Sequence, residues 1–205
     1  MIKKLFLTLV FSFICLFAYA DTVTYYFDAY DSGGEEWETN PANMADGEEN
    51  SYASTAENAV QLLDSNTCDG TDLGTISKVE LRAKAIVYNV FSDYIYLRPV
   101  FSGGDGDNND IGEMNNVWSG WLDITSDTNA PATWSWANVQ ALDCDVECVF
   151  GMVGGWCGMV EIRVTYTVGA AGVIKTYNGC AWSSVKTING LPVGSVKILN
   201  GAAAQ

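Results

Sequence analysis

The segment Lys78-VELRAKAIV-Tyr88 decides the class of fold. Its apolar residues Val79, Leu81, Ala83 and Ala85 alternate with Lys78, Glu80, Arg82 and Lys84. This period of two predicts a β-strand with one buried face and one solvent face. The segment Val160-EIRVTYT-Val168 repeats the pattern, with Ile162, Val164, Tyr166 and Val168 opposite Glu161, Arg163, Thr165 and Thr167.

Further short β-rich segments are separated by clusters of Gly, Asn, Asp and Ser. Strands are predicted at 22–27, 94–101, 118–125 and 144–149, and Pro99 predicts that its strand is an edge or ends there. Only 54–63 and 135–142 could be helical. The fold class expected is therefore all-β, an antiparallel jelly-roll β-sandwich.

The N-terminus has the pattern of a secretory signal peptide. Lys3 and Lys4 precede an uncharged apolar run at 5–17, and Ala18-Tyr19-Ala20 supplies the small residues of a cleavage site. The run is shorter than the ~20 residues of a membrane span, which disfavours an uncleaved anchor. We therefore expect a signal peptide at 1–20, a sandwich domain at 21–168 and a secreted or cell-surface protein.

The expected mature chain is strongly acidic and lacks histidine. All 25 Asp and Glu lie after residue 20, against 8 of the 10 Lys and Arg, which gives a net charge of −17. Such a chain repels nucleic-acid backbones, although it could attract divalent cations. The absence of histidine from the sequence removes His-based nucleophile activation and His-ligated zinc. No catalytic motif frames any pair of carboxylates, so we do not expect an enzyme.

The C-terminal segment is a repeat. After a small-residue linker at 169–172, three 11-residue units at 173–183, 184–194 and 195–205 each carry Lys, two residues, then Asn-Gly. The lysines are Lys175, Lys186 and Lys197. Asn-Gly favours a tight turn, which predicts a β-hairpin-like tail that docks, pairs with other copies or stays mobile.

Several motifs resemble known proteins. Trp134-SWANVQA-Leu142, followed by closing strands, resembles uncharacterised jelly-roll domains of secreted bacterial and phage-type proteins. The segment 37–54 resembles the opening of discoidin-like jelly rolls, and the 11-residue units resemble the Lys-x-x-Asn-Gly repeats appended to such proteins. The resemblance implies a β-sandwich, and it carries over no catalytic residue.

Two acidic places are candidate Ca²⁺ sites. Asp105, Asp107 and Asp110 lie close together in the segment 103–110 and offer hard oxygen ligands. The EF-hand spacing fails, so a polar hairpin turn is the favoured alternative. Asp46 is a second candidate, because the resemblance to discoidin-like folds implies a calcium loop around it.

Four tryptophans are candidates for stacking on sugar rings. Trp118 and Trp121 are three apart, so in a strand one would be exposed and the other buried, whereas Trp134 and Trp136 could share a face. The alternative is ordinary sandwich core, which we favour for most of the tryptophans in the chain.

Export makes disulfides the default for the cysteines after the signal peptide. Cys148 and Cys157 flank 151–155, and a hairpin centred there would place them opposite each other, which predicts a disulfide. Cys144 would then pair with Cys68 or Cys180, or stay free.

The function expected is a secreted, non-catalytic structural or adhesive surface protein that self-associates through its repeats. The alternative is a carbohydrate-binding module that stacks glycans on exposed Trp. A glycosidase or lyase is the least favoured class.

Overall fold

The computed structural model describes residues 20–33 and 37–168, and beyond them only the backbone of short strands between 176 and 203. The body contains β1 (Ala20–Ala29), η1 (Pro41–Met44), β2 (Ala53–Thr55), β3 (Ala59–Leu63), β4 (Ser65–Asn66), β5 (Thr75–Val87), η2 (Asn89–Phe91) and β6 (Tyr94–Phe101). It continues with β7 (Gly104–Asp105), β8 (Asn109–Asp110), β9 (Met114–Trp118), β10 (Leu122–Asp123), α1 (Trp136–Gln140), β11 (Asp143–Val149) and β12 (Gly155–Thr167).

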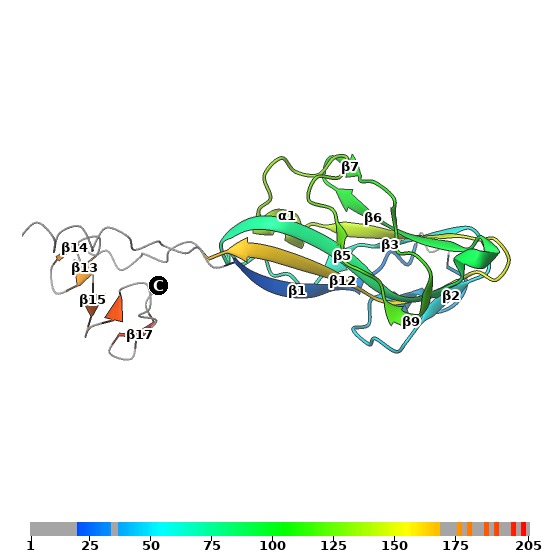
Figure 1. Cartoon of the computed structure of the whole chain (residues 1–205), viewed down its shortest axis with the longest axis horizontal. Coiled ribbons are helices and arrows are strands. Elements are labelled where there is room, and N and C mark those ends of the chain that lie inside the picture. Colours follow the sequence, from blue (N-terminus) through cyan, green and yellow to red (C-terminus); the bar gives the residue numbers. More distant parts are fainter. Residues whose placement is uncertain are drawn as a thin grey trace, which may run out of the picture. The chain divides into compact units, whose positions relative to one another are not determined.

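The body is an all-β sandwich of two antiparallel sheets, as the sequence predicts. The first sheet has the order β10-β5-β12-β1-β4, with β2 on β12 and β9 on β5. The second has the order β3-β11-β6-β7, with β8 on β6. Figure 1 shows β5, β12 and β1 side by side along the length of the body. The predicted buried faces of β5 and β12 are confirmed at Val79, Leu81, Ile162 and Val164. The face of β5 predicted to be in solvent is partly covered, since Glu80 and Lys84 are buried.

The core lies between the sheets and is closed by α1. Its largest fully buried side chains come from both sheets and from the segments between strands: Phe27, Met44, Leu63, Leu81, Ile95, Leu97, Ile124, Leu142 and Ile162. The helix predicted at 135–142 is confirmed as α1, and Ser135 caps it. The side chain of Ser135 accepts from the Asn138 N–H, while the Asn138 side chain accepts from the Ser135 N–H.

Several sequence predictions are wrong. Residues 54–63 form the end of β2 and all of β3 rather than a helix, because Ala59, Gln61 and Leu63 alternate inward with period two. Pro99 does not mark an edge, because β6 lies between β11 on one side and the short β7 and β8 on the other.

The predicted strand at 118–125 is broken. Trp118 pairs with Lys84, and Leu122 pairs with Leu81. The three residues 119–121 therefore lie opposite only two residues of β5. The buried Ser119 fixes this bulge: its N–H donates to the Ala83 carbonyl at 2.8 Å, and its Oγ accepts from the Ala83 N–H at 3.1 Å.

The remaining segments fall partly outside the described residues. The expected signal peptide lies outside the described residues, except for Ala20, which is the first residue of β1. The linker at 169–172 and the three repeat lysines also lie outside the described residues. The described strands of the tail are β13 (Thr176–Tyr177), β14 (Cys180–Ala181), β15 (Thr187–Ile188), β16 (Leu191–Pro192), β17 (Ile198–Leu199) and β18 (Ala202–Ala203). They pair as β13-β14, β15-β16 and β17-β18, and each pair flanks one Asn-Gly. Within the described part of the chain, no helix has the length and apolar character needed to cross a membrane.

Candidate functional site

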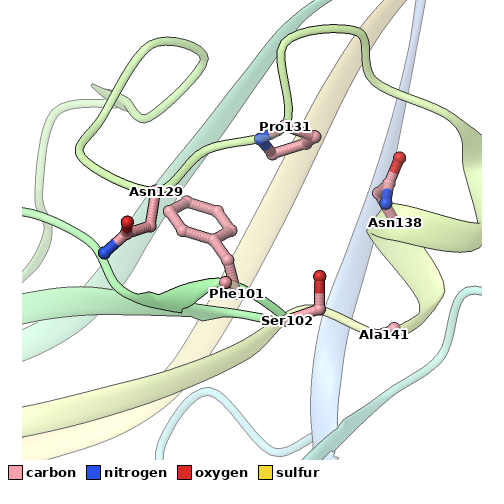
Figure 2. Close-up of a pocket in the computed structure, with 7 residues that line it drawn as sticks. Phe101, Ser102, Asn129, Pro131, Asn138 and Ala141 are labelled. Carbon is pink, nitrogen blue, oxygen red and sulfur yellow. The ribbon is translucent and has the colours of Figure 1, made fainter.

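A small hollow lies where the end of β6 meets the loop before α1 and α1 itself. It is lined by Phe101, Ser102, Gly103, Asn129, Pro131, Asn138 and Ala141, and its volume is about 170 Å³. Figure 2 shows the rings of Phe101 and Pro131 within this hollow, with Asn129 on one side and Asn138 on the other. We call it the Phe101 hollow.

The floor of the Phe101 hollow is apolar and fixed. Phe101 is the last residue of β6 and packs edge-on against Trp134, with ring centroids 5.8 Å apart at 79°. The Trp134 indole N–H donates to the Thr125 carbonyl at 3.0 Å, which anchors the loop in front of α1. An aromatic edge-to-face pair of this kind holds the Phe101 ring in one orientation.

The two amides of the hollow are held by local backbone structure. Asn129 has a positive φ of 63°, which Asn tolerates better than most residues, and its Nδ2 donates to the Asp105 carbonyl at 2.8 Å. Asn138 is positioned by the capping box, in which its Oδ1 accepts from the Ser135 N–H at 2.9 Å and from Ser135 Oγ at 2.6 Å.

The hollow retains free hydrogen-bonding groups of both kinds. Within the described part of the chain, Asn138 Nδ2 donates to no protein atom and the exposed Ser102 hydroxyl has no protein partner, whereas the Asn129 amide points away from the rings of Phe101 and Pro131 (Figure 2). None of the seven lining residues is charged. The hollow can therefore hydrogen-bond to a small neutral ligand as donor and as acceptor while its apolar floor packs against one face of it.

Trp134 and Trp136 are core residues rather than exposed platforms, which corrects one sequence prediction. They are 9% and 4% exposed, and the Trp136 indole N–H donates to the Gly74 carbonyl at 2.8 Å. Trp136 also packs edge-on against Tyr166, at 5.2 Å between ring centroids. The two tryptophans flank Ser135, which caps α1, and both rings point inward. This agrees with the alternative stated from the sequence, that they belong to the core of the sandwich.

Trp118 and Trp121 share one side of the sheet, which also corrects the prediction of opposite faces. The bulge at Ser119 returns Trp121 to the side of Trp118, and the Arg82 guanidinium carbon lies 4.2 Å from the centre of each ring. Arg163 lies 4.3 Å from the centre of the Trp121 ring. Both tryptophans are half-buried and already contact guanidinium groups, so less of their ring surface is left for a sugar.

Ion pairs surround this Trp–Arg ladder, which consists of Trp118, Arg82, Trp121 and Arg163. Arg82 Nη2 lies 2.5 Å from Glu161, and Arg163 Nη2 lies 2.7 Å from the buried carboxylate of Glu80. Lys78 approaches the same Glu80 at 2.7 Å. On this polar face of β5 and β12, the rings and guanidinium groups are therefore packed together and the charges are paired.

The candidate calcium residues do not converge. Asp105 lies 3.8 Å from Arg98, Asp107 accepts from Thr128 Oγ1 at 2.8 Å, and Asp110 accepts from the Gly112 N–H at 2.8 Å. Asp46 accepts from Ser51 Oγ at 2.6 Å and from the Glu48 N–H at 2.8 Å. Among the residues of known placement, no three His, Cys, Asp or Glu side chains form a group that could hold a metal ion. Calcium binding by Asp46, Asp105, Asp107 or Asp110 stays a prediction.

The predicted hairpin between Cys148 and Cys157 is wrong. Cys148 pairs with Ile95 and Ala59 in one sheet, whereas Cys157 pairs with Ala85 and Ala53 in the other. Both are buried free thiols, as are Cys68 and Cys144. Burial raises the pKa of the Cys148 thiol to about 12 and also raises the pKa of Cys157, so neither is a reactive nucleophile. The side chain of Cys180 lies outside the described residues.

Sequence reasoning missed every residue of the Phe101 hollow. The sequence predicted Phe101 only as the end of a strand and Asn138 only as part of a short helix. Only the pair Ser135 and Asn138 carried a usable signal, because their spacing is that of a capping box.

Comparisons with known proteins find no match in sequence and only a distant structural likeness. No protein-family model matches the chain, and no curated protein matches it. One similar solved structure is the family 32 carbohydrate-binding module from C. perfringens NanJ in complex with galactose. It is 12% identical, and the match covers 70% of this chain and 93% of that chain with a TM-score of 0.39. So distant a likeness carries no argument about what this chain binds.

Proposed function

We propose that the protein is a non-catalytic carbohydrate-binding module that holds one neutral sugar residue in the Phe101 hollow. The observation that carries the proposal is the pair of unpartnered groups beside an apolar floor: the Asn138 amide N–H₂ and the Ser102 hydroxyl, which can donate and accept. A sugar ring has an apolar C–H face and a rim of hydroxyl groups that both donate and accept. The C–H face of the sugar can pack on the apolar floor of the hollow, and its hydroxyl groups can bond to the polar groups at the rim.

The size of the hollow favours a terminal sugar. Its volume of about 170 Å³ is below the ~300–1,000 Å³ of pockets that enclose drug-sized ligands. A single sugar residue at the end of a chain can enter while the rest of the glycan extends into solvent. Because the lining residues carry no charge, a neutral sugar is preferred over a uronic acid or a sulfated sugar.

A binding role also fits the chemistry of the hollow better than hydrolysis. Glycoside hydrolysis needs two carboxyl groups on either side of the scissile bond, and no carboxylate lines this hollow. We further propose that the protein is exported and presents the hollow outside the cytoplasm, on the basis of the N-terminal pattern at 1–20.

Isothermal titration calorimetry against a panel of neutral monosaccharides and their methyl glycosides tests this function. Asn138→Asp keeps the oxygen that accepts in the capping box but removes the free N–H₂ donors, so we expect about tenfold weaker binding of the best sugar. Ser102→Ala should weaken it by a similar factor. Both variants should unfold at nearly the temperature of the unchanged protein.

A second pair of variants separates the side chain of Asn129 from its backbone conformation. Asn129→Gly keeps the positive φ and removes the bond to the Asp105 carbonyl that holds this wall of the hollow, so it should weaken binding. Asn40→Gly, at another positive φ of 49° outside the hollow, is the matched control and should leave binding unchanged. Absence of binding for the whole panel, or equal binding by all four variants, would refute the proposal.

A further inference from the structure

A second hollow adjoins the same segment as the Phe101 hollow, the one that leads into α1. Its volume is about 420 Å³, and its lining residues lie between 70 and 75 and between 133 and 137. They include Asp72, Thr75, Thr133 and Ser135, and we call this recess the Asp72 hollow. It is more than twice as large as the Phe101 hollow and falls within the ~300–1,000 Å³ that is usual for small-molecule pockets.

Only a thin wall separates the two hollows. Ser135 lines the Asp72 hollow and Asn138 lines the Phe101 hollow (Figure 2), and Ser135 Oγ lies 2.6 Å from Asn138 Oδ1. Trp134 also lines the Asp72 hollow, and its ring packs edge-on against Phe101 with 5.8 Å between the centroids. A ligand that leaves one hollow is therefore within about one side chain of the other.

The rim of the Asp72 hollow carries polar groups that the protein does not use. Asp72 Oδ1 accepts from the Gly74 N–H at 2.8 Å, which fixes the turn, whereas Asp72 Oδ2 has no partner among the described residues. The hydroxyl groups of the exposed Thr75 and Thr133 have no partner there either. The carboxylate oxygen can accept from a ligand hydroxyl, and each threonine hydroxyl can both donate and accept.

The floor of the Asp72 hollow differs from that of the Phe101 hollow. The Trp134 and Trp136 rings close it, but they are 9% and 4% exposed and so offer little surface for stacking. A ligand in this hollow is therefore held by hydrogen bonds at the rim, which favours a molecule that is rich in hydroxyl groups.

We propose that the Asp72 hollow is a second sugar subsite, which holds the residues that follow the terminal sugar of a glycan bound in the Phe101 hollow. This inference rests on the proposed function, because it takes the Phe101 hollow as the site of the terminal sugar. The glycan leaves that hollow on its solvent side and passes over Ser135 and Ala137, which are both exposed. The Phe101 hollow packs one face of the terminal sugar, and the Asp72 hollow bonds to the hydroxyl groups of the next residues.

Asp72 sets the preference of the second subsite. An ionised carboxylate only accepts hydrogen bonds, and charge-assisted bonds are about twice as strong as neutral ones. No basic side chain lines the hollow, so it has no partner for a uronic acid or a sulfate group. The second subsite therefore selects neutral sugar residues with free hydroxyl groups.

A divalent cation is the competing occupant of the Asp72 hollow. Asp72 supplies the only carboxylate among the lining residues, whereas Ca²⁺ takes six to eight oxygen ligands. The hydroxyl groups of a glycan need no such set, which makes the sugar the better fit.

Isothermal titration calorimetry with an oligosaccharide series tests the inference. The probes are the neutral monosaccharide that binds best and the neutral disaccharides and trisaccharides that end in it. At least one oligosaccharide should bind about tenfold more tightly than the monosaccharide. Asp72→Asn keeps the oxygen that holds the turn and replaces the free carboxylate oxygen with N–H₂, so it should remove most of this gain and leave the monosaccharide affinity within about twofold.

Asp69→Asn is the matched control. Asp69 is also exposed and accepts from the N–H two residues further on, that of Thr71, at 2.9 Å, but it does not line the hollow. Both variants remove one negative charge, so only a direct contact distinguishes them. Asp69→Asn should bind every member of the series like the unchanged protein.

The outcomes separate this inference from the proposed function. The second subsite is overturned, and the function stands, if longer glycans bind no better than the monosaccharide or if their gain survives Asp72→Asn. A gain that appears only with added Ca²⁺ and is lost in EDTA would assign the Asp72 hollow to a metal ion and would also overturn it. If no sugar binds, or if Asn138→Asp leaves monosaccharide binding unchanged, the proposed function fails and the second subsite fails with it.

Discussion

Asp93 shows at the scale of one residue how a buried charge can be stabilising. Burial alone would raise the pKa of its carboxyl, but the four backbone N–H donors of 151–154 outweigh it, and the pKa of Asp93 is lowered. The carboxylate thus contributes stability that is present above the unfolded pKa near 4 and is lost as the pH falls through the folded value.

Replacing Asp93 should therefore destabilise the protein in a pH-dependent way. We expect Asp93→Ala to lower the free energy of unfolding by at least about 2 kcal/mol at pH 7, because several loop N–H groups lose their acceptor. The difference from the unchanged protein should shrink below pH 4. Urea unfolding at several pH values measures it, and Asp110→Ala, which loses one acceptor contact at an exposed site, serves as control. A loss independent of pH would contradict the role of the charge.

The sequence could not reveal this clamp or the residues of the Phe101 hollow. Asp93 is one acid among 25, and its partners are backbone groups about 60 positions away, so no side-chain pattern marks it. Asn129 and Asn138 likewise come to opposite sides of one hollow only through the loop that leads into α1 (Figure 2). Side chains that alternate along β5 were predictable, because their burial follows from local spacing alone.

At the scale of elements, the bulge between β9 and β10 decides where two tryptophans point. A regular strand over 118–125 would separate Trp118 and Trp121, and the prediction followed that regular geometry. The extra residue of the bulge at Ser119 brings both tryptophans to the same side of the sheet, where they form the Trp–Arg ladder. Bulges depend on a partner strand, so a single strand's sequence does not reveal them.

The ladder should depend on the planar shape of arginine. Arg82→Lys keeps the charge but loses the flat guanidinium between Trp118 and Trp121 and its two contacts with Glu161. We expect it to lower the free energy of unfolding by about 1–2 kcal/mol in urea. Lys78→Arg, on the same strand face, should change it by less than about 0.5 kcal/mol. Equal stability of Arg82→Lys and the unchanged protein would show that the ring contacts contribute nothing.

At the scale of the whole molecule, the sandwich was predictable and the pairing of its strands was not. The segments 94–101 and 144–149 were found almost to the residue, because β-branched and aromatic residues bounded by turn residues mark strands. Adjacent strands β11 and β12 nevertheless lie in different sheets, so Cys148 and Cys157 are not partners in a hairpin. A local hairpin was the simplest expectation, and the long-range pairing of β12 with β5 overrides it.

The uncharged Phe101 hollow stands apart from the acidic character of the whole chain. Of the 25 acids of the chain, none lines this hollow, so sugar binding there should be insensitive to salt.

The most direct test of the central claim is an amide NMR titration of the mature protein with the neutral sugar that binds best. Sugar binding in the Phe101 hollow predicts saturable shifts of the Ser102, Gly103, Asn129 and Asn138 signals and no change at Trp118 or Trp121. Shifts confined to the Trp–Arg ladder, or no saturable shifts at all, would contradict it.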